Sequence, residues 1–321
     1  MRYVVTGGTG FVGAYVVRDL LKAGHDVTVY DLQPNLEFLE DVLGEPPHDV
    51  RVVSGDVRDL PLLLRTFREA QPERVVHLAS TLGAGSEFNP LRTVQVNIEG
   101  TIHAFEAALE VGAEKVVWAS SIAVFGPTSL RSGEGIANDD YHAPVRLYGA
   151  CKTFLEQLTL NYRRERQLDA VGLRFAVVYG YGKALTVERG SRAVHLTELI
   201  EKPALDEPAV VPYGDDVQNL VYVEDVARAV VLASQALGTQ PAGLNVGGED
   251  VLLRDAAAIV QELLPDADIE VQPGIRDGSA GYDLSTTREQ IGYESAFSLR
   301  EGLRRTINAM RLKAGLPQIE G

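Results

Sequence analysis

The sequence is poor in cysteine, because Cys151 is the only one among 321 residues. A single thiol cannot form an internal disulfide, and it cannot supply the several sulfur ligands of a multi-cysteine zinc site. The histidines offer no substitute, since His25 and His77 stand apart without a cluster of further ligands around them. We therefore expect no bound metal, and we interpret Cys151 as a packing residue.

Long apolar runs and positive net charge are also missing. No uninterrupted apolar stretch approaches the roughly 20 residues that a membrane helix needs. The opening MRYVVTGG reaches glycine too soon for the apolar region of a signal peptide. The formal net charge is −15 at pH 7, so the phosphates of a nucleic acid would be repelled. We expect a cytoplasmic protein that acts on a small molecule and binds neither membrane nor nucleic acid.

The remaining composition, with 45% hydrophobic residues, is typical of a globular protein. Short β-branched runs alternate with helix-length amphipathic segments, as in a parallel sheet covered by helices on both faces. The runs are YVVT at 3–6, VTVY at 27–30, VRVVS at 50–54, RVVHLA at 74–79, KVVWAS at 115–120 and AVGLRF at 170–175. We predict an α/β fold with a Rossmann-like, doubly wound parallel sheet.

The rhythm breaks after residue 178, where loops, prolines and charged clusters follow. We predict a nucleotide-binding domain over 1–178 and a smaller C-terminal lobe, mainly for substrate, over 179–321. Residues 220–248 again have the pattern of a helix and a short strand, and we expect them to return to the first domain. The segment SLRE at 298–301 has the spacing of a capping box and predicts the start of a last helix.

The first predicted strand runs into a glycine-rich turn, TGGTGFVG at 6–13. Gly7 allows a tight turn, Gly10 lets the backbone approach a pyrophosphate, and Gly13 permits close packing of helix on strand. Phe11 and Val12 begin the helix, whose N-terminus then faces the anion. We predict that these five residues bind a dinucleotide, and the alternative is a turn that serves packing alone.

Two aspartates at the ends of later strands complete this pattern. Asp31 ends the second strand, where a carboxylate can bind both ribose hydroxyls of an adenosine. The same charge repels a 2′-phosphate, and DLQPN at 31–35 offers no basic residue, so we predict NAD rather than NADP. Asp56 follows the third strand and is a candidate for binding the adenine amino group, with Val57 against the adenine face. The alternative for Asp56 is a simple turn residue.

A tyrosine and a lysine stand four residues apart in RLYGACK at 146–152. A helix places Tyr148 and Lys152 on one face, although chance surface pairs of this kind are the alternative. A free phenol has a pKa near 10, so a tyrosine that acts as a base at neutral pH needs that value lowered by roughly two to three units. A lysine one turn away and the positive nicotinamide of NAD would supply the necessary field.

Taken together, these motifs resemble those of the extended short-chain dehydrogenase/reductases, in the NAD-dependent epimerase/dehydratase family. The resemblance covers nearly the whole chain. It rests on motifs in the family's order, which are TGGTGFVG at 6–13, Asp31, GDVRD at 55–59, HLAS at 77–80, VNIEGT at 96–101, SSIAVFG at 120–126, YGACK at 148–152 and LVYVEDVARA at 220–229. It implies an enzyme in which NAD lies along the strand ends.

The resemblance also assigns roles position by position. Ser121 matches the family's catalytic Ser/Thr, and Tyr148 and Lys152 match its YxxxK pair, in which the lysine also binds the nicotinamide ribose. It places further residues along the cofactor, namely Leu78, Ala79, Ser80, Asn97, Ser120 and Tyr179. Family members often dimerise through the YxxxK helix and the helix near 92–111, so we expect a homodimer.

The sequence departs from sugar-nucleotide epimerases at two substrate positions. RFAVVYGYGKAL at 174–185 lacks an Asn that is common there, and Gln218 stands where an Arg is common. A neutral amide cannot replace the bidentate grip of Arg on a diphosphate, although Arg276 is a candidate for part of that role. A dehydratase fits no better, because Ser121 is followed by apolar residues and not by Asp and Glu. The phrase SSIAVFGP is instead similar to that of short-chain L-threonine dehydrogenases.

The candidate substrate contacts are basic or polar, and they are Arg146, Lys183, Arg189, Arg192, Gln218 and Arg276. The cations are candidates for a carboxylate or phosphate clamp, with solvated loop charge as the alternative. We favour an NAD-dependent dehydrogenase that oxidises a secondary hydroxyl of a small sugar-like or hydroxy-acid substrate. The alternative is an NAD-dependent (nucleotide-)sugar epimerase with a transient keto intermediate and retained NAD. A non-enzymatic NAD-binding regulator is disfavoured, because the Ser, Tyr and Lys are all present.

Overall fold

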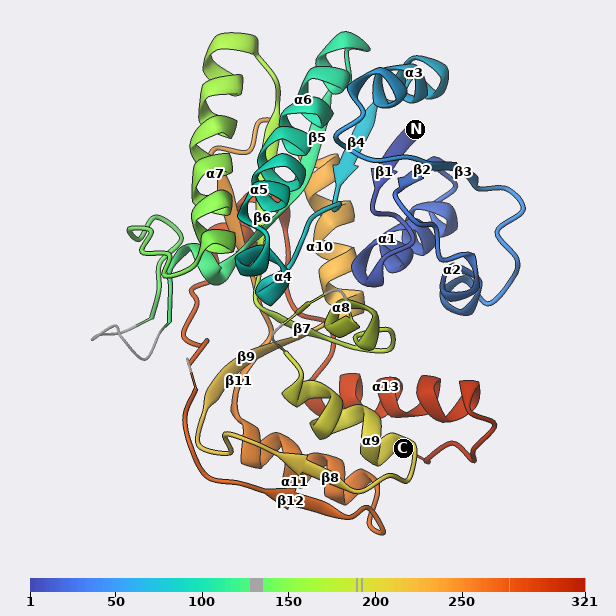
Figure 1. The fold of residues 1–321 in the computed structure, drawn as a ribbon, viewed down its shortest axis with the longest axis vertical. Helices are drawn as coiled ribbons and strands as arrows, with labels where there is room; N and C mark the ends of the chain where they lie inside the picture. The colour runs from blue at the N-terminus through green and yellow to red at the C-terminus, as the bar shows by residue number, and fades with distance from the viewer. Residues whose placement is uncertain (128–134, 189, 192, 277, 321) are drawn as a thin grey trace.

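The computed structural model describes residues 1–127, 135–188, 190–191, 193–276 and 278–320. Within these ranges, seven parallel strands form the larger sheet in the order β10-β6-β5-β4-β1-β2-β3 (Figure 1). They are β1 (Arg2–Thr6), β2 (Asp26–Asp31), β3 (Arg51–Ser54), β4 (Arg74–His77), β5 (Lys115–Ser121), β6 (Ala170–Phe175) and β10 (Gly243–Val246). The order runs outward in both directions from β1 and β4, which opens a crevice at their carboxyl ends. The prediction of a Rossmann-like, doubly wound sheet is confirmed.

Helices cover both faces of this sheet because its strands are apolar on both sides. The side chains of Tyr3 and Val5 join the core beneath α1 (Phe11–Lys22), α2 (Leu36–Leu43) and α10 (Val223–Gln235). Val4, between them, points the other way and packs with α3 (Leu60–Ala70), α6 (Gly100–Glu110) and α7 (Leu147–Arg166). The two hydrophobic clusters therefore hold the sheet between two helical layers.

A smaller lobe lies beyond the carboxyl ends of the strands, at the bottom of Figure 1. It contains a three-stranded sheet of β11 (Glu249–Leu252), β9 (Val217–Tyr222) and β7 (Val177–Tyr179), and a pair of β12 (Ile269–Val271) and β8 (Ala209–Val211). Its helical elements are α8 (Ala184–Glu188), η4 (Thr197–Glu201), α9 (Lys202–Ala204), α11 (Leu253–Leu263) and α13 (Leu299–Lys313). Ser298 caps α13 by accepting a hydrogen bond from the Glu301 N–H at 3.2 Å.

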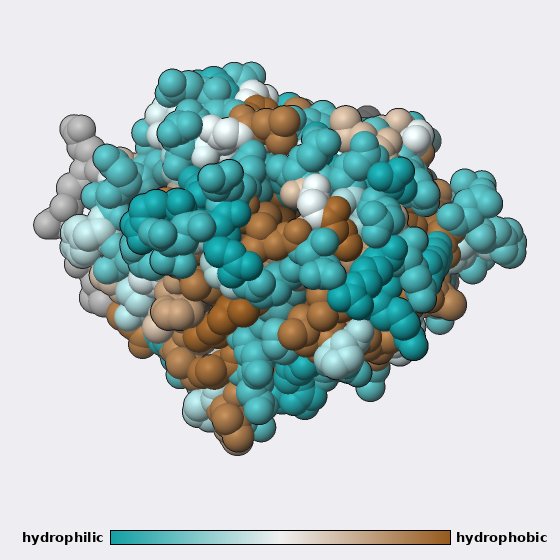
Figure 2. Space-filling model, turned by 90° about the horizontal axis from the view of Figure 1, so that it is seen from above, coloured by the Kyte–Doolittle hydropathy of each residue, from teal (hydrophilic) through white to brown (hydrophobic). Residues whose placement is uncertain are grey.

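The remaining short elements are α4 (Gly83–Phe88), α5 (Pro90–Thr93), η1 (Val94–Glu99), η2 (Ile122–Val124) and α12 (Ser285–Ile291). The surface seen from above is mostly hydrophilic with local apolar patches (Figure 2). Among the described residues, no helix combines the length and the apolar character needed to cross a membrane, and no group of three or more potential metal ligands was found.

Helix α7 is fixed to the sheet by a buried ion pair. Arg174 of β6 donates from Nε and Nη2 to the two carboxylate oxygens of Glu156, at 2.9 and 2.6 Å. Both side chains are at most 5% exposed. Ser120 Oγ adds a hydrogen bond to Glu156 Oε1 at 2.7 Å. Because a bidentate pair fixes orientation as well as distance, this contact sets how α7 lies against β5 and β6.

Removing one partner of this pair leaves the other charge buried and unpaired. We expect Glu156→Ala to lower the free energy of unfolding by about 3 to 5 kcal/mol in urea titrations. The matched control is Glu165→Ala on the same helix, where the glutamate is 56% exposed beside Arg164, and it should leave stability unchanged. Equal losses in the two variants would show that the buried pair does not anchor the helix.

Candidate functional site

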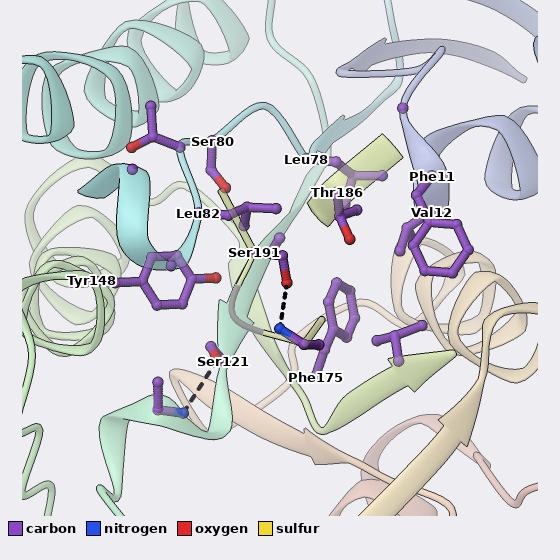
Figure 3. Close-up of a pocket in the computed structure, with 18 of the residues that line it drawn as sticks. Phe11, Val12, Leu78, Ser80, Leu82, Ser121, Tyr148, Phe175, Thr186 and Ser191 are labelled. Atoms are coloured by element: carbon purple, nitrogen blue, oxygen red, sulfur yellow. Dashed lines mark hydrogen bonds between the residues drawn. The ribbon is translucent and has the colours of Figure 1, made fainter. Parts of the chain in front are cut away.

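A cavity of about 820 Å³ runs from the glycine turn to the smaller lobe. Its walls come from the carboxyl ends of β1, β2, β4, β5 and β6, and from the segment after β7. In Figure 3, Phe11 and Val12 lie at one side of this cavity and Tyr148 points into it from the other. The strand order therefore opens a cavity at this edge of the sheet. The predicted nucleotide-binding turn and the predicted base, Tyr148, both line it.

The glycine turn brings the backbone of α1 close to the neighbouring strands. Gly7 has a φ of +71°, and an added Cβ would lie 2.9 Å from the Ala79 nitrogen. An added Cβ on Gly13 would lie 2.1 Å from the Gly7 carbonyl oxygen. Gly10 is the N-cap of α1 and provides no side-chain cap. The first amides of α1 therefore remain open to an anion in the cavity.

Asp31 lies at the end of β2 and lines the cavity. Its Oδ2 accepts hydrogen bonds from the Thr9 N–H at 3.1 Å and the Thr9 hydroxyl at 2.7 Å. Its Oδ1 accepts the Gln33 N–H at 3.4 Å. The carboxylate is therefore oriented and keeps acceptor capacity for ribose hydroxyls. These features fit the adenosine half of NAD. The nicotinamide half of that cofactor would supply a hydride acceptor and, once reduced, a hydride donor.

Asp56 and Val57 line the same end of the cavity. Arg58 donates to Asp56 Oδ2 from Nε at 2.9 Å and from Nη2 at 2.6 Å. This hydrogen bonding holds the pKa of Asp56 below its usual value. The carboxylate therefore stays ionised beside the cavity, and Arg58 is a neighbour that the sequence analysis did not consider.

Ser121 and Tyr148 both line the cavity, and their side chains form a hydrogen bond. Ser121 ends β5, and Tyr148 stands in the first turn of α7. Burial raises the pKa of Tyr148 to about 12, and a hydrogen bond with Ser121 opposes that rise. Lys152 lies one turn further along α7, with Nζ 5.4 Å from the centre of the tyrosine ring. The three residues have the arrangement of a phenol base, its hydroxyl partner and a nearby cation.

Lys152 is buried behind the tyrosine and does not line the cavity. Its Nζ donates to the Ala119 carbonyl oxygen at 2.7 Å. Burial lowers the pKa of Lys152 to about 8. The lysine therefore lies near the phenol without lining the cavity itself.

Two further residues were missed from the sequence. Gly149 lets α7 approach the turn after Ser121, because an added Cβ would lie 2.4 Å from the Ala123 carbonyl oxygen. Glu156 holds Ser120 and Arg174, as described above. The signal for Glu156 was present, since it follows Tyr148 and Lys152 at the next helical position with the same spacing.

Most predicted cofactor residues line the cavity. They are Gly7, Gly10, Phe11, Val12, Gly13, Asp31, Asp56, Val57, Leu78, Ala79, Ser80, Ser120 and Tyr148. Asn97 is buried outside it and acts indirectly, because its Oδ1 accepts the N–H of the cavity-lining Thr81 at 2.8 Å. The expectation for Tyr179 is corrected, since its ring packs on Tyr222 and its hydroxyl donates to the Leu299 carbonyl oxygen at 3.4 Å, away from the cavity.

The predicted substrate residues fall into three groups. Arg146, Lys183 and Arg276 line the cavity. Arg189 and Arg192 lie outside the described residues. Gln218 is buried and is not a cavity-lining residue.

A histidine that the sequence analysis did not single out connects Gln218 to the cavity. Gln218 Nε2 donates to Asp216 Oδ2 at 3.0 Å, so its Oε1 is the acceptor for His195 Nε2 at 2.9 Å. The other ring nitrogen, Nδ1, then accepts from Arg276 Nη1 at 3.3 Å. Burial, with Arg276 nearby, lowers the pKa of His195 to about 4, so this cavity-lining ring is neutral. Gln218 thus positions His195 and, through it, Arg276.

The pKa of Tyr148 gives a direct test of the site's electrostatics. A raised value favours the neutral phenol, so NAD-free protein should show no tyrosinate from this residue below about pH 10. The measurement is the absorbance at 295 nm of the wild type minus that of Tyr148→Phe. Saturating NAD should move the difference to lower pH, because a positive nicotinamide favours the phenolate. A transition near pH 7 without NAD would contradict the buried, neutral state.

Comparison with known proteins gives a consistent set of relatives. UDP-glucuronic acid decarboxylase 1 of Arabidopsis thaliana is 28% identical over 320 residues, covering 97% of this chain and 70% of the relative. UDP-glucose 4-epimerase of Neisseria meningitidis serogroup B is 26% identical over 325 residues, covering 94% of each. The expectation that the protein is an enzyme is confirmed.

Solved structures give the same picture. A UDP-glucose 4-epimerase of Thermus thermophilus, in complex with NAD, has a TM-score of 0.81 at 28% identity, covering 97% of this chain and 99% of that one. A Thermotoga maritima UDP-glucose 4-epimerase with UDP-glucose has a TM-score of 0.85 at 26% identity, covering 98% and 100%. The model of the NAD dependent epimerase/dehydratase family matches residues 3–247, more than half of the chain. The chain therefore belongs to the NAD-dependent epimerase/dehydratase family, and its cofactor is NAD.

Proposed function

We propose that the protein is an NAD-dependent sugar-nucleotide epimerase, which oxidises a secondary hydroxyl transiently and reduces the keto intermediate again. Tyr148 is placed to take the hydroxyl proton and later to return it, while Ser121 holds the substrate oxygen. The observation that carries the proposal is the position of the carboxylate side chains that line the cavity. Among the described residues, its carboxylates are Asp31 and Asp56, both at the predicted adenosine end.

The composition of the cavity wall near Tyr148 separates epimerisation from elimination. The turn after Ser121 contributes Ile122 and Ala123 to this wall. An elimination needs a second acid or base close to the sugar, and these apolar residues supply none. A decarboxylation would begin with the same oxidation, and several relatives carry that name.

The segment that follows β7 is tied to α1 and α2. The Tyr15 hydroxyl donates to the Tyr181 carbonyl oxygen at 3.0 Å, and the Tyr181 hydroxyl donates to Asp41 Oδ2 at 2.8 Å. Gly182 has a φ of +97° and packs so closely that an added Cβ would lie 2.3 Å from the Phe38 ring. These contacts hold the chain just before Lys183, which is a residue of the cavity wall.

A net dehydrogenase acting on a small hydroxy compound is the second candidate. It is favoured by Val177, which lines the cavity and offers no amide contact to a nucleotide-sugar base. It is also favoured by Gln218, which carries no charge for a diphosphate and is engaged with His195. Arg276 would then bind a carboxylate or phosphate of the smaller substrate.

One incubation distinguishes the two functions. We expect the purified protein to convert a UDP-sugar into its epimer, detected by ¹H NMR, without NADH accumulating at 340 nm. Tyr148→Phe should reduce the rate by about 10²- to 10⁴-fold, because the proton acceptor is lost. Accumulation of NADH with free hydroxy acids or sugar acids, and no reaction of UDP-sugars, would establish the dehydrogenase instead.

We also propose that the protein forms a homodimer through α7 and the preceding helical segments. Exposed apolar residues lie there, with Phe88 at 92%, Leu91 at 71% and Phe154 at 48% exposed. Apolar side chains this exposed favour burial against a partner. The double substitution Phe88→Asp and Phe154→Asp should yield a monomer by multi-angle light scattering, whereas Leu237→Asp, far along the chain in another exposed position, should not change the oligomeric mass. An unchanged mass in the double variant would contradict this interface.

A further inference from the structure

Lys183 is a buried cation whose charge the fold itself does not neutralise. The side chain lines the cavity, yet the residue is only 8% exposed. Among the described residues its ammonium forms no hydrogen bond and no ion pair within 4 Å, and its nearest carboxylate influence is the Coulombic field of Glu201. Burial lowers the pKa of Lys183 to about 8, which reflects the cost of keeping this charge out of water.

Several contacts hold the segment around Lys183 in this position. The preceding Tyr181 and Gly182 are tied to α1 and α2 by the contacts described above. The following residue, Ala184, donates its backbone N–H to Glu201. The segment that carries Lys183 is therefore held on both sides of this residue. Lys183 is not a lysine on a loose surface loop.

The ammonium faces the beginning of the glycine-turn helix. Lys183 Nζ lies 5.6 Å from the centre of the Phe11 ring, at the first residue of α1. Thr186, one turn further on, lies on the Phe11 side of the cavity in Figure 3. The uncapped amides of α1 and the ammonium thus border the same part of the cavity from two different elements.

We propose that Lys183 binds the diphosphate of NAD, from the wall opposite the amides of α1. A diphosphate carries the negative charge that both the α1 amides and the Lys183 ammonium favour. It would form the ion pair that the ammonium lacks among the described residues. The inference rests on the NAD dependence of the family and not on which substrate is converted. It assigns to the segment after β7 a direct role in cofactor binding, in addition to its place beside the substrate.

A phosphate of the substrate is the other possible source of the same anion. The structure favours the cofactor, because Lys183 contacts the first residue of α1. This contact lies at the end where the diphosphate of a dinucleotide meets the helix. The other cations that line the described part of the cavity, Arg92, Arg146 and Arg276, lie on other segments. The charge of Lys183 also reaches His195, the partner of Arg276.

The test measures binding without turnover, by isothermal titration calorimetry of NAD-free protein. Lys183→Gln should weaken NAD and ADP-ribose by about 10- to 100-fold, since a hydrogen bond between charged groups is lost. Adenosine, which lacks phosphate, should bind as it does to the wild type. Lys183→Arg should restore most of the affinity. Lys202→Gln removes the same charge from an exposed ion pair with Glu198 and should leave all three affinities unchanged.

Thermal unfolding separates this role from a structural one. Because Lys183→Gln removes a buried charge that makes no ion pair with the described residues, the melting temperature of the NAD-free variant should equal or exceed that of the wild type. A lower melting temperature with unchanged affinity for NAD and ADP-ribose would overturn the proposal. So would unchanged NAD binding combined with weaker binding of UDP to the NAD-loaded protein, which would assign the lysine to the substrate. Neither result affects the test of the epimerase function, which measures conversion of a UDP-sugar and not cofactor binding.

Discussion

The close contact between α7 and the carboxyl end of the sheet is the constraint on which the rest of the site depends. Gly149 permits the approach, and the buried pair of Glu156 and Arg174 holds it. Tyr148 stands on the first turn of the same helix, so its position relative to Ser121 follows from packing that begins two turns away. A shift of this helix by about one ångström would weaken the hydrogen bond between the two hydroxyls, because hydrogen bonds weaken steeply with distance and angle.

Burial sets the charges of this site as well as its shape. It favours the neutral phenol of Tyr148 and disfavours the ammonium ions of Lys152 and Lys183. A bound dinucleotide offers a positive ring to the first and an anionic diphosphate to the last. The NAD-free protein is therefore electrostatically incomplete at both ends of one cavity. The same binding event relieves both costs, which couples readiness for catalysis to occupancy by the cofactor.

The fold and the nucleotide half of the site were predictable because each motif has a local cause. The turn at Gly7 and Gly13 requires glycine, and Asp31 lies at the end of a strand. The position of these residues in the sequence therefore determines where they lie in the fold. Tyr179 was not predictable in this way. Its strand, β7, belongs to the three-stranded sheet and pairs with β9, which turns the ring toward α13. Only the long-range pairing decides which face of so short a strand meets the cavity.

The substrate end was harder to predict because its polarity is carried by pairs distant in sequence. His195, Gln218 and Arg276 meet only when three separate segments of the smaller lobe come together. The same reasoning explains how a protein of net charge −15 accommodates anionic ligands. Net charge governs the long-range field, which salt screens within about 10 Å, whereas Lys183, Arg146 and Arg276 act inside a cavity where a ligand meets them at contact distance. The binding of an anionic ligand in this cavity therefore depends on these few cations and not on the net charge of the protein.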